Sequence, residues 1–90
     1  MRYQVHWVSE AEGELASIWI RAEDRDLITR TAFSIDRMLG NNPENAGESR
    51  SGDRRVLLIP PLGVTFSVSP QDRIVLVLNV WRFDQRRPNP

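Results

Sequence analysis

The chain has 90 residues, 40% hydrophobic and 27% charged, which is the composition of an ordinary globular domain with one modest core. Because it contains no cysteine, it can form neither a disulfide framework nor a thiolate zinc site. The sequence has no apolar run of roughly 18 residues and no basic region followed by a long apolar stretch at its N-terminus. We therefore expect a cytoplasmic protein that does not interact with a membrane.

The net charge of zero conceals a division along the chain. Residues 1–48 contain five Arg and nine acidic residues, a balance of −4, whereas residues 49–90 contain seven Arg and three acidic residues, a balance of +4. All twelve basic residues are Arg, a usage that a GC-rich genome also produces. Six of the C-terminal arginines are expected at strand ends, where they could form a basic patch: Arg50, Arg54, Arg55, Arg82, Arg86 and Arg87.

Residues 2–8 alternate between polar and apolar side chains, which predicts a half-buried strand with Tyr3, Val5 and Trp7 on its inner face. An amphipathic helix is expected over residues 10–22. Ser9 and Glu12 have the spacing of a capping box at its start. Its apolar stripe consists of Ala11, Leu15, Ile18, Trp19 and Ala22.

A second amphipathic helix follows a charged break at residues 23–26, where Asp24 or Asp26 can act as the N-cap. Gly40 is predicted to end this helix in the C′ position, because residues 41–43 read Asn-Asn-Pro. Two helices with so short a connection form an antiparallel hairpin. The second stripe consists of Ile28, Ala32, Ile35 and Leu39.

Residues 41–53 read as a long unstructured loop and residues 84–90 as a flexible tail. Between them, three runs rich in β-branched and aromatic residues predict an antiparallel meander over residues 54–83. The last run is apolar from Ile74 to Leu78, so we expect it inside the sheet with both faces covered. The prediction is a single α+β domain over residues 1–90. A helical hairpin should lie on one face of a mostly antiparallel four-stranded sheet, in the order β-α-α-β-β-β.

The three tryptophans, Trp7, Trp19 and Trp81, come from three different elements, and we expect them to meet in the core. Trp19 and Ile35 in particular should pack on the inner face of the first strand. Stacking of a ligand on one of the indoles is the alternative.

No metal-ligand spacing, Gly-rich phosphate loop or nucleophile motif occurs, so we expect neither a cofactor nor a metal. The remaining candidates are His6, the single histidine, and the Arg cluster. If the first and last strands of the meander flank the middle one, they run parallel, which places Arg54 and Arg55 at the opposite end from Arg82. Arginine forks bind phosphates and carboxylates equally well, so the cluster fits RNA or an acidic peptide. Alternatively, these arginines pair with nearby acids or are solvated.

The order of elements resembles the RelE/ParE superfamily of bacterial toxins from type II toxin–antitoxin modules, over roughly residues 3–87. The opening Y-Q-V-H-W-V-S-E-A-E-G-E-L-A-S-I-W is similar to the family's first strand and helix. L-G-N-N-P, the meander and V-L-N-V-W-R-F are similar to its later elements and closing strand. The resemblance implies a toxin held inactive by a cognate antitoxin. RelE-like members cut messenger RNA on the ribosome without metal, ParE-like members act on DNA gyrase, and a catalytically silent antitoxin-binding relative is the third alternative.

The resemblance also assigns residues. Arg55 (or Arg54) matches the basic position that opens the family's second strand, and Arg82 matches the Arg that closes its last strand. Gly63 or a neighbour stands where RNA-cleaving members usually carry an Arg, and residues 85–90 lack their aromatic hydroxyl group.

Because Arg is a poor base, proton transfer in RNA cleavage would fall to His6, Tyr3 or a carboxylate such as Glu48 or Asp84. Our expected catalytic set is Arg82, Arg55 and His6, with Arg82 stabilising the phosphorane charge. RNA or the antitoxin would bind Arg50, Arg54, Arg86 and Arg87. Antitoxin carboxylates are expected to face Arg55, Arg82 or Arg86, on a segment that also crosses the helical hairpin.

Overall fold

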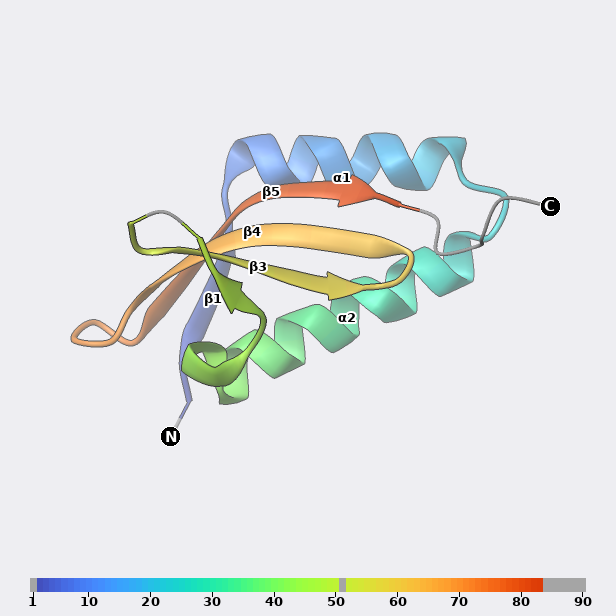
Figure 1. The fold of residues 1–90 in the computed structure, drawn as a ribbon. Helices are drawn as coiled ribbons and strands as arrows, with labels where there is room; N and C mark the ends of the chain where they lie inside the picture. Colours follow the sequence, from blue (N-terminus) through green and yellow to red (C-terminus); the bar gives the residue numbers. More distant parts are fainter. Residues whose placement is uncertain (1, 51, 84–90) are drawn as a thin grey trace, which may run out of the picture.

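The computed structural model describes residues 2–50 and 52–83 (Figure 1). Its elements, in chain order, are β1 (Gln4–Trp7), α1 (Ser9–Arg21), α2 (Arg25–Asn41), the 3₁₀ turn η1 (Pro43–Asn45), β2 (Glu48–Ser49), β3 (Arg54–Ile59), β4 (Leu62–Ser69) and β5 (Ile74–Arg82). The described strands form one sheet in the order β1-β5-β4-β3-β2. β1 runs parallel to β5, and the other neighbouring pairs are antiparallel.

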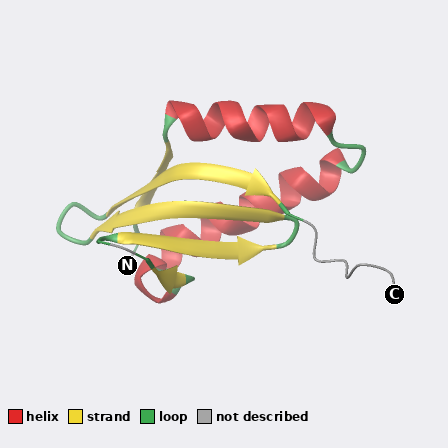
Figure 2. Ribbon diagram, turned by 45° about the horizontal axis from the view of Figure 1, so that its top comes forward, coloured by secondary structure: helices red, strands yellow, loops and turns green. Residues whose placement is uncertain are grey.

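The predicted α+β class is confirmed, with one strand more than expected. Both helices lie on the same face of the sheet, α1 along β5 and α2 crossing behind the other strands (Figures 1 and 2). β5 lies inside the sheet, as predicted, with β1 and β4 as its neighbours, but only its helix-side face is covered. Leu76 is exposed on the other face, so the expectation that both faces are covered was wrong. Within the described ranges, none of the helices has the length and apolar character needed to span a bilayer.

α1 begins without the predicted capping box. Val8 is the N-cap, and no side chain caps the helix. The Val8 amide still donates to Val77 O of β5 (3.0 Å), while Val8 O already accepts from the Glu12 amide (2.9 Å). The chain therefore turns straight from β1 into α1, and Ser9 has a helical backbone that cannot serve as a cap.

α2 continues past Gly40 and ends at Asn41, so the predicted C′ role of Gly40 was wrong. The Gly40 carbonyl accepts a hydrogen bond from the Tyr3 amide (2.8 Å), which anchors the start of β1 to α2. Asp24 occupies the N-cap position but makes no side-chain capping bond there.

Much of the segment predicted as an unstructured loop, residues 41–53, is ordered by η1 and β2. Glu48 and Ser49 pair with Val56 and Arg55 of β3. Gly47 has a φ of +66°, and a Cβ at this position would collide with the backbone carbonyl of Val56. This close approach of two backbones requires glycine.

The core between sheet and helices consists mainly of aliphatic residues around Phe66. Ile35 is fully buried in it, as predicted, but the three tryptophans do not meet there. Trp7 is half-buried, whereas Trp19 is 42% exposed and Trp81 is 36% exposed. The other residues of the apolar stripe of α1 face the sheet, whereas Trp19 is turned toward α2.

Trp81 lies on the open face because of a β-bulge. Thr65 pairs with Asn79, but the next residue, Phe66, pairs with Val77, so β5 contains one extra residue. The insertion reverses the alternation along β5: Val77 and Val80 both face the core, and Trp81 faces away from it.

Candidate functional site

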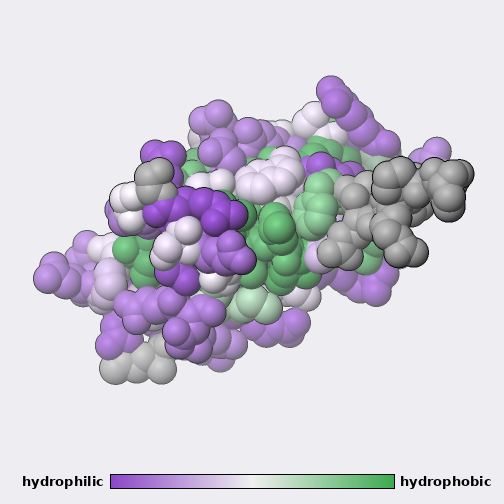
Figure 3. Space-filling model, in the orientation of Figure 1, coloured by the Kyte–Doolittle hydropathy of each residue, from purple (hydrophilic) through white to green (hydrophobic). Residues whose placement is uncertain are grey.

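The register of the strands arranges the open face of the sheet in rows. His6 pairs with Leu76, Leu76 with Ser67, and Ser67 with Arg54, so these four residues form one row across β1, β5, β4 and β3. Figure 3 shows hydrophobic side chains near the middle of the face turned to the viewer, bordered by hydrophilic ones. The open face is therefore mixed in character, with polar groups toward the start of β3.

The predicted separation of the arginines is observed. Arg54 pairs with Ser67 near the end of β4, whereas Arg82 pairs with Leu62 at its beginning. Arg55 and Arg82 therefore lie at opposite ends of the sheet. Arg86 and Arg87, together with Asp84, fall outside the described residues.

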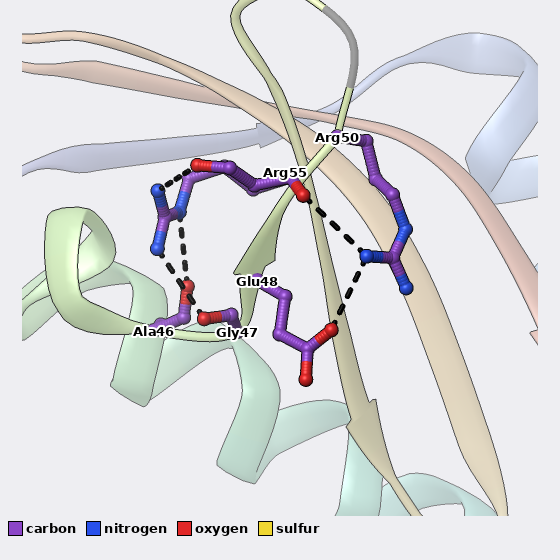
Figure 4. A network of polar contacts seen from close by, with 6 residues as sticks. Ala46, Gly47, Glu48, Arg50 and Arg55 are labelled. Atoms are coloured by element: carbon purple, nitrogen blue, oxygen red, sulfur yellow. Dashed lines mark hydrogen bonds and ion pairs between the residues drawn. The ribbon is translucent and has the colours of Figure 1, made fainter.

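Arg55 holds the segment between α2 and β3. Its Nε donates to Ala46 O (3.0 Å), its Nη2 to Gly47 O (3.3 Å) and its Nη1 to Ser49 Oγ (3.0 Å) (Figure 4). The guanidinium fork thus binds two backbone carbonyls that immediately precede the short strand β2. Arg50, also drawn in Figure 4, forms an exposed ion pair with Glu48 (3.2 Å).

Arg82 connects the end of β5 to the break between the helices. Its Nη1 and Nη2 donate to Asp24 Oδ1 (2.9 Å) and Oδ2 (2.8 Å), a bidentate pair between residues 58 positions apart. The hydrogen bonds from Arg82 hold the pKa of the Asp24 carboxyl below its ordinary value. The arginine expected to stabilise a phosphorane is therefore bound to a carboxylate of its own chain.

His6 is exposed on the open face, at the edge strand β1. It lines a shallow cavity of about 400 Å³ that also contains Asp53, Asp72 and the hydroxyl group of Ser67. Asp72 accepts a hydrogen bond from Ser69 Oγ (3.3 Å) at the rim. The cavity brings an imidazole and two carboxylates together, but neither Arg55 nor Arg82 lines it.

Sequence reasoning missed the role of Glu14. β5 extends beyond the end of β1, and there the Glu14 carboxylate of α1 accepts hydrogen bonds from the Val80 amide (2.9 Å) and from Asn79 Nδ2 (3.3 Å). One side chain therefore covers the edge of β5 where strand pairing stops.

A groove of about 680 Å³ between α1 and α2 was also missed. Trp7 and Trp19 line it, together with Ile20 of α1 and Phe33 of α2, which are 63% and 68% exposed. The two helices diverge from the break at residues 22–24 (Figure 1), so the groove opens between them. The sequence did carry a signal, because Ile20 and Phe33 are large apolar residues that lie off both predicted stripes.

No protein-family model and no curated protein matches the sequence. Solved structures do match. The toxin–antitoxin complex RelBE2 from Mycobacterium tuberculosis superposes with a TM-score of 0.75 at 13% identity, covering 91% of this chain and 92% of that one. The chromosomal ParDE toxin–antitoxin system from P. aeruginosa gives a TM-score of 0.70 at 16% identity, covering 92% and 98%. The isolated E. coli RelE toxin gives 0.65 at 14% identity, covering 93% and 87%. This chain has a RelE/ParE-type fold.

Within this RelE/ParE-type fold, the position of Gly63 has a steric explanation. Gly63 pairs with Leu58 on one side and Trp81 on the other. A Cβ on Gly63 would lie 2.7 Å from the Trp81 ring and 2.8 Å from Leu58 Cδ2. The indole therefore occupies the space that a longer side chain at this position would need.

Proposed function

We propose that this chain is the toxin component of a type II toxin–antitoxin module, inactive while bound to a cognate antitoxin and acting on a protein target when released. The fold supports the module assignment, because the similar structures named above include toxin–antitoxin assemblies. DNA gyrase, the target that the resemblance gives for ParE-like members, is the first target to test. We propose a cytoplasmic location for this action.

The observation that carries the choice of a binding mechanism is the dispersal of the expected catalytic set. Leu76, the partner of His6, precedes Arg82 by six residues of β5, so the backbones of His6 and Arg82 are about 20 Å apart at a strand rise of about 3.3 Å per residue. They also face opposite ways, because Arg82 shares the face of buried Leu62. A base and a charge-stabilising cation must reach the same phosphate, and these two cannot.

The experiment has two stages. Induced expression of the chain alone should arrest growth, and co-expression of the protein encoded by the adjoining reading frame should restore it. Purified chain should then inhibit gyrase supercoiling and leave messenger RNA on translating ribosomes intact. Cleavage of that RNA by wild-type protein, reduced in His6→Ala, would overturn the binding mechanism.

RNA cleavage remains the second candidate, and one observation favours it. His6 and Arg54 lie in the same row of the open face, three strand spacings or about 14 Å apart. Two successive nucleotides of an RNA could contact both side chains at this distance, whereas a single phosphate could not. In this case Arg54→Ala and His6→Ala should each reduce cleavage, whereas Arg82→Ala should leave it unchanged.

A further inference from the structure

The open face of the sheet carries more apolar side chain than a solvated face usually does. Antiparallel sheets with one face in water normally place polar residues on that face. Here Leu58, Leu76 and Trp81 point away from the core and are 53%, 37% and 36% exposed. Large apolar side chains gathered on one exposed face indicate an interaction surface.

At one end of this face, Leu58 and Trp81 converge over Gly63. A Cβ on Gly63 would lie 2.7 Å from the Trp81 ring and 2.8 Å from Leu58 Cδ2, so both side chains cover the glycine backbone. Because Gly63 has no side chain, the three residues form one apolar surface across β3, β4 and β5. Two sheets pack face to face through surfaces of this kind, so a second sheet is a suitable partner.

The other end of the same face carries charges of both signs. Arg54 is exposed at the start of β3, and within residues 2–50 and 52–83 no carboxylate pairs with it. The cavity of about 400 Å³ at this end contains the carboxylates of Asp53 and Asp72 beside His6, and Arg54 does not line it. The face therefore holds a cation and a carboxylate-lined cavity that it does not join within one molecule.

A two-fold axis that runs along the strands between β4 and β5 would join them. The row that begins with His6 and ends with Arg54 then faces the same row of a second copy in reverse order, so each Arg54 lies opposite the cavity of the other copy. The two Trp81 rings, which lie over Gly63, meet close to the axis. A two-fold contact requires both members of each complementary pair on one face, and the open face has them.

The size of the face is sufficient for a weak dimer. The four strands β1, β5, β4 and β3 span about 19 Å at a spacing of about 4.8 Å, and the 8 residues of β4 extend about 26 Å. Two copies would together cover about 1,000 Å², which is the lower limit for a specific interface. We therefore expect a dissociation constant in the micromolar range.

We infer that the open face of the sheet binds the open face of a second copy of this chain. Leu58 and Trp81 form the apolar contact, and each Arg54 faces the carboxylates of the other copy's cavity. The inference goes beyond the proposed function, because it requires neither an antitoxin nor a target. Since the dimer covers His6 and Arg54, RNA could reach their row only in the monomer, whereas the helix side stays accessible in both states.

Sedimentation of the purified chain at increasing concentration tests the apolar contact. Wild type should show a monomer–dimer equilibrium, and Leu58→Glu should weaken it about tenfold, because an unpaired charge would be buried. Phe33→Glu is the matched control, since Phe33 is an exposed apolar residue of α2 on the helix side, and should change nothing. A wild-type chain that stays monomeric throughout the micromolar range would overturn the inference, as would a dimer that only Phe33→Glu dissociates.

A charge exchange tests the two-fold arrangement. Arg54→Glu sets carboxylates against Asp72 of the other copy, and Asp72→Arg sets arginines against Arg54, so each variant alone should dimerise about tenfold more weakly than wild type. An equimolar mixture of the two variants should recover the wild-type affinity, because every facing pair then has opposite charges. Arg37→Glu, which changes an exposed arginine of α2, should have no effect. A mixture that associates no better than its components would overturn the inference, while growth arrest and its rescue remain a separate test of the proposed function.

Discussion

The two ends of the sheet use the same residue type in different ways. At the start of β3, Arg55 is partly buried and donates to backbone carbonyls and one hydroxyl of residues 46–49. At the end of β5, Arg82 forms a bidentate pair with Asp24, and both side chains are 40% exposed. Removing Arg55 takes a charged donor from two backbone carbonyls, whereas removing Arg82 returns an exposed carboxylate to water. The contribution of a strand-end arginine to stability therefore depends on whether its partner groups can still form hydrogen bonds with water after the arginine is removed.

The largest effect is expected at the Arg55 end, for Gly47→Ala. The added methyl group would collide with Val56 O at a φ of +66°, so we expect a loss of about 3 kcal/mol in the free energy of unfolding. Gly52→Ala is the matched control, with a φ of +64° but no heavy atom within 4 Å of the added Cβ, and should cost about 1 kcal/mol. Urea denaturation of both variants gives the comparison. Equal losses would show that the close approach to Val56 contributes nothing.

Arg55→Ala should destabilise the chain by about 2 kcal/mol, because the carbonyl oxygens of Ala46 and Gly47 lose a charged donor. Arg55→Lys keeps the charge but not the fork, so it should recover little of the loss. Urea denaturation of the three proteins measures this. Full stability of the Lys variant would mean that charge, and not geometry, is the contribution.

At the opposite end of the sheet, Gly63→Ala should cost about 1–2 kcal/mol, because the Trp81 ring must shift away from the new methyl group. The shift should also alter the fluorescence of Trp81, which can be isolated by comparison with Trp81→Phe. Thermal denaturation and emission spectra are the measurements. An unchanged spectrum together with unchanged stability would contradict the packing of Trp81 over Gly63.

The smallest effect is expected for Asp24→Asn, and it should depend on pH. The hydrogen bonds from Arg82 hold the folded-state pKa of Asp24 below its ordinary value, so the ionised carboxylate stabilises the fold above that ordinary value, and this contribution is lost as the pH falls through the folded pKa. Wild type should therefore be slightly more stable than the variant at pH 6, and the difference should vanish near pH 2. A difference that persists at pH 2 would assign the effect to something other than the ion pair with Arg82.

Periodicity predicted the helices and the meander because each depends on neighbours along the chain, and Ile28, Ile35 and Leu39 are buried as their spacing indicated. It could not predict the side on which Trp81 lies, since one extra residue in β5 reverses the alternation without a mark in the sequence.

The candidate site was less predictable than the fold. The opposite positions of Arg55 and Arg82 followed from strand order, but their partners did not, because Asp24 lies 58 residues from Arg82. The groove depends on the angle between α1 and α2, which packing of both helices on the sheet sets. Only the off-stripe positions of Ile20 and Phe33 indicated it.

The parallel pairing of β1 with β5 has a consequence for synthesis. Gln4 pairs with Ile74, so β1 must wait until β5 has been made before it gains its neighbour in the sheet. Contacts between residues this far apart in sequence raise the contact order and slow folding. While the chain is emerging from the ribosome, α1 and α2 can form, but the edge of β1 has no strand to pair with until β5 has been released. The order of the strands thus delays completion of the sheet until β5 has been made.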